Sequence, residues 1–260
     1  MKIKIILSIT AITWMMVAGC NQNQIDKSEE EAQVTTKSTL VQEGELIWDY
    51  PVKPGMVEWA SFTTGKQMID ACQIPQDVLD KICTSDLVAI CLNYPLFGDY
   101  TAANDKRKGI SFLIETFNGF KELSIRKDGV LELIKTYKSF PVLDYLPDEL
   151  SINYHTPYKL PFLEMLIADD IFINQLDRET AVELEQISLD KYASKLDNSE
   201  VYSLYNIKHT MLLWAVVADT HNPTAKTPEQ LKTVKRFIVN YSNAFESSLL
   251  TEISLIMSSL

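Results

Sequence analysis

Glycine is scarce in this sequence and is absent from its second half. The chain has 8 glycines among 260 residues, and none follows Gly129. Tight β-hairpins usually need glycine in the turn, so this absence argues against a β-rich fold beyond that point. We therefore expect helices there.

The sequence also lacks basic stripes and internal membrane spans. The formal net charge is −11, and no run of lysine and arginine is interleaved with aromatic residues. An acidic body repels a phosphate backbone, so we expect no nucleic-acid partner. The most apolar run after the N-terminus, residues 210–218, is about half the length of a membrane-spanning helix and is interpreted as core.

Histidine and cysteine are too sparse to predict a metal site. His155, His209 and His221 are the 3 histidines, and no two of them have helical metal-site spacing. We expect no metal and no cofactor. Leaving aside the cysteine near the N-terminus, an odd number remains, which permits at most one internal disulfide. Buried thiols are expected at Cys72, Cys83 and Cys91.

The N-terminus has the order of a secretory signal peptide. Two lysines precede an apolar stretch at residues 5–17, which ends in small residues before Cys20. Residues 17–20, Val-Ala-Gly-Cys, resemble the bacterial lipobox, whose cysteine is acylated after cleavage. The resemblance implies a signal peptide over residues 1–19 and lipid attachment at Cys20. Several acyl chains on one residue suffice for stable membrane anchoring.

Residues 20–46 combine the lipidated Cys20 with a segment rich in Gln, Glu, Ser and Thr. The segment lacks aromatic residues and a periodic apolar face, so it predicts a flexible acidic tether. Its run Ser28-Glu29-Glu30-Glu31 resembles the acidic patch that directs some Bacteroidetes lipoproteins to the cell surface. Ordinary linker charge is the alternative, so periplasmic and surface-facing orientations both stay open.

Cap chemistry places the starts of several helices. Thr64 and Thr227 are each followed three residues later by glutamine, which is the spacing of a capping box. Apolar periodicity extends the elements from such starts. We predict helices over residues 65–73, 75–83, 85–93, 100–117, 128–139, 158–175, 178–196, 199–219 and 228–258, the last with a break near 242–243.

These helices are joined by short connections, except where prolines interrupt residues 141–157. Successive helices with brief links favour antiparallel packing. We therefore predict an all-α fold, an irregular array of antiparallel helices of α-hairpin or superhelix type, in one domain over residues 47–260. A hinge near 141–157 is expected. The aromatic residues ahead of the first helix, such as Tyr50, should anchor an extended arm, although a carbohydrate platform is an alternative.

Four segments carry a wider resemblance. "YPVKPGMVEWASF" at 50–62, "ACQIPQDVLDKI" at 71–82, "LVAICLNYPLFGDY" at 87–100 and "GFKELSIRKDG" at 119–129 are similar to a group of uncharacterised lipoproteins from Bacteroidetes-type bacteria. The resemblance implies a Gram-negative cell envelope. It supplies no activity and no functional residue.

Asp170 is the first candidate site residue. On the predicted 158–175 helix it falls on the same face as Leu163 and Leu166. A carboxylate on an apolar face must be paired or protonated. Lys208 is the expected partner if the two helices pack. Perturbed acids occur at active sites, so a hydrolase with a site around Asp170 is one alternative function.

His209 and the loop 93–109 complete the candidates. The helical wheel places His209 on an apolar face with Tyr205, so we expect a core histidine bonded to a neighbour. The loop concentrates Asp99, Asn104 and Asp105 beside aromatic residues, which makes it the best exposed recognition candidate. Its acid spacing does not match a calcium-binding loop.

The sequence favours a lipid-anchored helical interaction or ligand-binding lipoprotein of the bacterial outer membrane. Its expected partners are the membrane, through acylated Cys20, and another envelope protein or a small ligand. We assign no catalytic residue. The alternatives are the hydrolase around Asp170 and an immunity-type lipoprotein that binds a secreted toxin.

Overall fold

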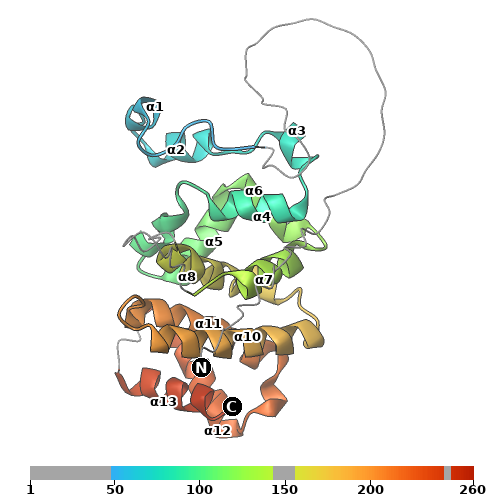
Figure 1. The fold of residues 1–260 in the computed structure, drawn as a ribbon, viewed down its shortest axis with the longest axis vertical. Coiled ribbons are helices and arrows are strands. Elements are labelled where there is room, and N and C mark those ends of the chain that lie inside the picture. Colours follow the sequence, from blue (N-terminus) through green and yellow to red (C-terminus); the bar gives the residue numbers. More distant parts are fainter. Residues whose placement is uncertain (1–47, 143–155, 243–246) are drawn as a thin grey trace, which may run out of the picture. The chain divides into compact units, whose positions relative to one another are not determined.

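The computed structural model describes residues 48–142, 156–242 and 247–260. All regular elements in these ranges are helical, which confirms the all-α class (Figure 1). The predicted signal peptide, Cys20 and the tether lie outside the described residues, as do most of the expected hinge and His155. Among the described helices, none is long and apolar enough to cross a membrane.

The described part of the chain before the proline-rich segment contains short helices. In chain order they are α1 Val57–Ala60, α2 Gly65–Ala71, α3 Gln76–Leu79, α4 Thr84–Leu92, the 3-10 helix η1 Phe97–Ala102, α5 Lys106–Thr116, α6 Asn118–Ile125 and α7 Gly129–Ser139.

The remaining helices are longer on average. They are α8 Thr156–Ile167, α9 Asp170–Ile173, α10 Arg178–Asp197, α11 Leu204–His221, the 3-10 helix η2 Pro223–Ala225, α12 Pro228–Asn240 and α13 Ser247–Ser258.

Both predicted capping boxes are confirmed. The Thr64 side chain accepts a hydrogen bond from the Gln67 amide, and the Gln67 side chain accepts one from the Thr64 amide. Thr227 and Gln230 make the same pair of bonds at the start of α12. These bonds satisfy donors that a helix N-terminus otherwise leaves unpaired.

Two predicted helices are broken by aspartates that act as N-caps. The predicted 100–117 helix is η1 followed by α5, because the Asp105 carboxylate accepts the Arg107 and Lys108 amides. The predicted 158–175 helix stops at Ile167, and Asp169 caps a new short helix by accepting the Ile171 amide. Aspartate competes with helix continuation in this way because its carboxylate replaces the intrahelical acceptor.

Residues 118–125 form a helix that the sequence analysis left unassigned, and the predicted extended arm contains the short helix α1. The arm itself is anchored by Tyr50. This side chain is buried, and its hydroxyl donates to the Ile90 carbonyl at 2.9 Å. Tyr50 also packs against Tyr94 and Phe117, so its predicted anchoring role is confirmed.

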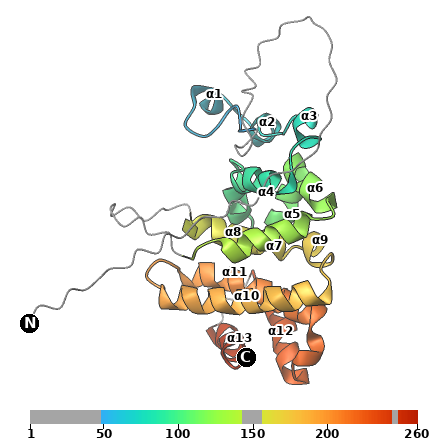
Figure 2. The ribbon, with the colours of Figure 1, turned by 45° about the vertical axis from the view of Figure 1, so that its right-hand side comes forward.

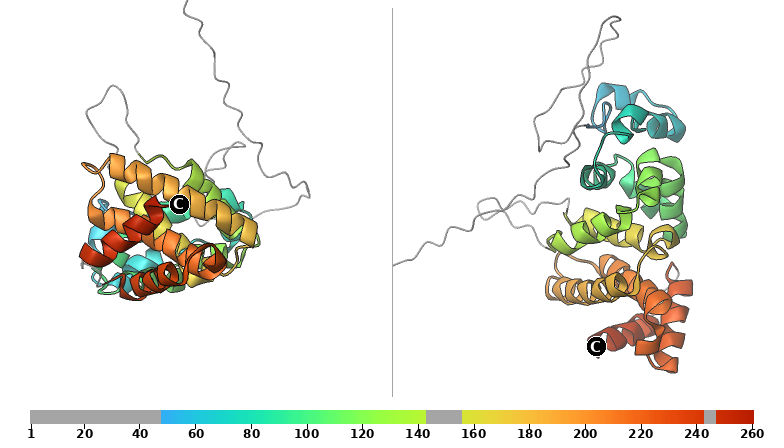
Figure 3. Two further views of the ribbon diagram at one scale, coloured as in Figure 1. Left: turned by 90° about the horizontal axis from the view of Figure 1, so that it is seen from below. Right: turned by 90° about the vertical axis from the view of Figure 1, so that its right-hand side faces the viewer.

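Helices that are neighbours or near neighbours in the chain pack together from α4 to α13. α4 contacts α6 and α7, α7 contacts α8, and α11 contacts α8, α10 and α12. Figure 2 shows α10 lying along α11, and Figure 3 shows the red α12 and α13 beside the orange α10 and α11. α11 is the central core element, since residues 207–218 are all buried. This confirms that the apolar run at 210–218 is core.

Candidate functional site

A pocket of about 420 Å³ lies where η1 meets the start of α5. The three candidates from the predicted recognition loop all line it, together with residues that the α5 helix contributes. The lining consists of Asp99, Ala103, Asn104, Asp105, Lys108, Gly109 and Phe112. Its volume falls within the range of small-ligand sites.

Asp105 fixes the shape of this pocket. One carboxylate oxygen accepts the Arg107 amide at 3.1 Å and the Ser242 hydroxyl at 3.0 Å, which ties α5 to the end of α12. Partial burial acts to raise the pKa of Asp105, but bonds from Ser242 and from the Lys108 and Arg107 amides outweigh it and lower the pKa. Asp105 is therefore an ionised structural group at neutral pH.

Gly109 allows η1 and α5 to approach closely. A Cβ atom at this position would lie 2.7 Å from the Tyr100 carbonyl oxygen, which is too short for a real contact. The pocket floor thus requires glycine because the backbone of the neighbouring element occupies the space of a side chain.

The remaining polar groups of the pocket are unpaired. Within the described residues, the side chains of Asp99, Asn104 and Lys108 have no hydrogen bond or ion pair. Desolvation raises the pKa of Asp99, although the residue lies at the surface. Phe112 forms an apolar wall and is 52 % exposed. The pocket therefore offers an acid, an amide, an ammonium and a ring to a ligand.

Asp170 is not buried, which corrects the prediction for this residue. Its side chain is 78 % exposed, and it pairs with Arg107 at 3.2 Å. Asp170 is exposed because α8 ends at Ile167, which places this residue in the first turn of α9 instead of on the apolar face of a longer helix. An exposed pair of this kind contributes little stability. The buried Asp170 on which the hydrolase alternative was built is therefore wrong, and the hydrolase activity itself stays a prediction.

Lys208 is buried, but Asp170 is not its partner. The Lys208 ammonium donates to the Tyr241 carbonyl at 2.9 Å and lies 4.9 Å from the centre of the Tyr241 ring. Desolvation lowers the pKa of Lys208. Its visible contacts tie α11 to the end of α12, which is a structural role.

His209 is the core histidine that the sequence predicts. It is fully buried, and its Nδ1 lies 2.8 Å from the Tyr205 carbonyl oxygen. A carbonyl only accepts hydrogen bonds, so Nδ1 carries the proton and Nε2 faces the Tyr100 hydroxyl at 3.4 Å. Burial lowers the pKa of His209 to about 3, despite the bond to Tyr205. The imidazole is neutral at physiological pH.

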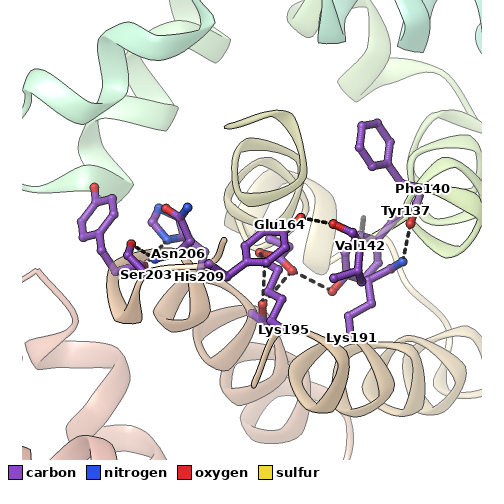
Figure 4. Close-up of polar contacts among 12 residues, drawn as sticks. Tyr137, Phe140, Val142, Glu164, Lys191, Lys195, Ser203, Asn206 and His209 are labelled. Carbon is purple, nitrogen blue, oxygen red and sulfur yellow. Dashed lines mark hydrogen bonds and ion pairs between the residues drawn. The ribbon is translucent and has the colours of Figure 1, made fainter. Parts of the chain in front are cut away.

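A buried polar network in the core was missed by the sequence analysis. Figure 4 shows Glu164 between Tyr137 and Lys195. The Lys195 ammonium donates to Glu164 at 2.7 Å, and the Tyr137 hydroxyl donates to the other carboxylate oxygen at 3.1 Å. Thr210 donates to Glu164 and accepts from Lys195. All four residues are fully buried.

This network joins α7, α8, α10 and α11 and is closed to solvent. Every oxygen of the Glu164 carboxylate has a protein donor, so the network is a satisfied structural unit without a free position for a substrate. A second buried pair joins Glu185 and Lys226 at 2.6 Å, with Asn222 on the remaining carboxylate oxygen. The signal for Glu164 was a charge inside the apolar stretch of α8, whereas Glu185 lies in the charge-rich α10 and Lys226 follows η2, so the second pair had no such signal.

The three cysteines within the described residues form no disulfide. Cys72, Cys83 and Cys91 are free; Cys72 and Cys91 are buried as predicted, while Cys83 is partly exposed. Burial raises the pKa of the Cys72 thiol to about 12, so this thiol is unreactive at neutral pH. In the described parts of the chain, histidine, cysteine, aspartate and glutamate nowhere gather in threes that would hold a metal ion.

Comparison of the chain with protein-family models, with characterised proteins and with solved structures gives no match.

Proposed function

We propose that this protein is a membrane-anchored helical binding protein that holds a ligand or a segment of an envelope partner in the pocket between η1 and α5. The observation that carries the proposal is the set of unpaired side chains on Asp99, Asn104 and Lys108 in one pocket. These three side chains are exposed to solvent and line the same pocket as Phe112, so their polar groups are accessible to a ligand beside an apolar ring.

The rest of the molecule supports binding more than chemistry. The buried acid Glu164 has its acceptor positions filled, and the neutral His209 is enclosed by aromatic side chains of Tyr100, Tyr205 and Tyr241. A general acid or base has to reach the proton that it transfers. The immunity-type function stays a prediction, and under it the same pocket would hold a toxin segment.

Two tryptophan substitutions at neighbouring alanines test whether the pocket binds a ligand. Ala103 lines it, whereas the neighbouring Ala102 is exposed outside it. Ala103→Trp should fill the pocket, and Ala102→Trp should leave it open. Native mass spectrometry of the protein released from its own membranes in mild detergent should show a non-covalent adduct on the wild type and on Ala102→Trp. The adduct should be missing from Ala103→Trp; a wild type without an adduct, or one retained by Ala103→Trp, would contradict the proposal.

The anchor is a separate part of the proposal and rests on Cys20. Cys20→Ala should abolish acylation and leave the precursor uncleaved, since the other cysteines do not stand at an apolar-to-polar border. Mass spectrometry of the membrane fraction measures both outcomes. A mature chain with an unmodified Cys20 would refute the anchor and leave the pocket unaffected. Whether external protease cuts the tether on intact cells decides between the surface and the periplasm.

A further inference from the structure

We infer that the pocket between η1 and α5 selects a small zwitterion with an apolar body, namely a free amino acid or a short peptide. This inference rests on the proposed binding function and specifies its ligand. It starts from the two opposite charges that line the pocket, the Asp99 carboxylate and the Lys108 ammonium.

These two charges do not neutralise each other. Across the described residues, neither Asp99 nor Lys108 takes part in an ion pair, although both line the same pocket. A zwitterion places its ammonium and carboxylate a few ångströms apart and complements both groups at once. A simple cation would meet repulsion from Lys108, and a simple anion would meet repulsion from Asp99 and from the ionised Asp105.

The other acid of the pocket is not available to a ligand in the same way. Asp105 already accepts the Ser242 hydroxyl and caps the N-terminus of α5. The positive end of that helix is therefore occupied by a carboxylate of the chain itself. The Lys108 ammonium, which also attracts the Asp105 carboxylate, is the anion-recognising group, and Asp99 is the cation-recognising group.

The apolar part of the pocket suits the body of such a ligand. Phe112 contributes an aromatic ring to the lining, and Ala103 and Gly109 contribute no bulky side chain. The volume of about 420 Å³ accommodates an amino acid or a dipeptide. The unpaired Asn104 amide can both donate and accept, and it matches a peptide group or an ammonium and carboxylate pair.

The test uses ligands that share a phenyl group on a short carbon chain and differ in their charged groups. L-phenylalanine carries both charges, phenethylamine lacks the carboxylate, 3-phenylpropanoate lacks the ammonium, and L-alanyl-L-phenylalanine separates the two charges further. Titration calorimetry on the full chain in detergent should give Kd values for phenylalanine or the dipeptide about tenfold below those of both single-charge analogues. If phenylalanine binds more tightly, the ligand class is a free amino acid; if the dipeptide binds more tightly, it is a short peptide.

The variants assign each charge. Asp99→Asn should raise the Kd of the zwitterion to that of 3-phenylpropanoate, and Lys108→Met should raise it to that of phenethylamine. Ala103→Trp should abolish binding of all four compounds. Asp77→Asn and Lys121→Met remove exposed charges on α3 and α6 and should change no Kd.

Two results would overturn the inference without touching the proposed function. In the first, phenethylamine binds as tightly as phenylalanine and Lys108→Met has no effect, so the pocket is a cation site. In the second, none of the four compounds binds although Ala103→Trp still removes the native adduct, so the pocket holds a ligand of another class.

Discussion

Replacing Glu164 with alanine should lower the free energy of unfolding by about 3–5 kcal/mol. The substitution removes the acceptor of three hydrogen bonds and leaves the Lys195 ammonium buried, with the Thr210 hydroxyl and the Tyr202 ring beside it. A buried charge without its counter-ion is far more costly than a lost surface pair. Urea titration of the wild type and of Glu164→Ala measures the difference.

An exposed glutamate gives the matched control. Glu183 pairs with Lys138 on the surface, and both side chains are about half exposed or more. Glu183→Ala removes the same chemical group and should change the unfolding free energy by under about 1 kcal/mol. If Glu164→Ala unfolded at the same urea concentration as Glu183→Ala, the network would have no stabilising role.

A double variant separates the charge from the packing. Glu164→Leu combined with Lys195→Met replaces both charges by apolar groups of similar size. Well-packed apolar replacements of a buried ion pair are often neutral or stabilising. We expect the double variant to be more stable than Glu164→Leu alone or Lys195→Met alone, since neither charge is then buried without its counter-ion. A double variant less stable than Glu164→Ala would mean that the polar contacts of Tyr137 and Thr210 dominate.

Glu164 is a buried acid of this fold, whereas the predicted one, Asp170, is exposed. The principle that a carboxylate on an apolar helix face needs a cation is correct, but it applies to Glu164 and not to Asp170. Glu164 follows Leu163 inside α8, whereas Asp170 follows Asp169 after α8 has ended at Ile167. The error came from treating 158–175 as one helix, since Asp169 was not considered as a cap.

Local chemistry was predictable where it depends on neighbours in the chain. The capping boxes at Thr64 and Thr227 and the core character of α11 follow from residues within one turn of each other. Long-range partners were not predictable. The choice of Lys195 as the partner of Glu164 depends on how α10 packs against α8, and no local pattern specifies that.

The pocket could be predicted from the sequence only in part. Its acids and amide, Asp99, Asn104 and Asp105, stand in a loop that composition alone identifies as a recognition candidate. Lys108 and Phe112 come from the first turns of α5, and their contribution depends on where that helix begins. Asp105 sets that start, so the pocket becomes visible once its capping role is known.

Lowering the pH from 7.5 to 4 should reduce the free energy of unfolding of the wild type, in part because of His209. The His209→Asn variant should lack this part of the loss. Burial holds the pKa of His209 at about 3 in the folded state, while an unfolded histidine has a pKa of about 6.5. Between these values the unfolded chain binds a proton that the folded chain does not. Stability is therefore lost as the pH falls through the unfolded pKa, and by pH 4 the loss reaches about 3 kcal/mol.

Asparagine is the informative replacement, because its amide can donate to the Tyr205 carbonyl as Nδ1 does and stays neutral at every pH. At pH 7.5, His209→Asn should be less stable than the wild type, since the smaller side chain leaves space among Tyr100, Tyr205 and Tyr241. At pH 4 the unfolding free energy of His209→Asn relative to that of the wild type should be about 3 kcal/mol more favourable than at pH 7.5, because only the wild type loses stability through the histidine. Carboxylates that titrate in the same range affect both proteins alike and cancel in the difference.

The imidazole can also be followed directly by NMR. Its ring-proton resonance in the folded wild type should keep the neutral chemical shift down to about pH 4, because charging the ring would place a cation among the nearby ammonium groups of Lys195, Lys208 and Lys106 without solvent. A resonance that titrates near pH 6.5 in the folded state would show that the ring gains a counter-charge or water on protonation. The deficit of His209→Asn would then be the same at both pH values, and the acid sensitivity of the protein would have to come from its carboxylates.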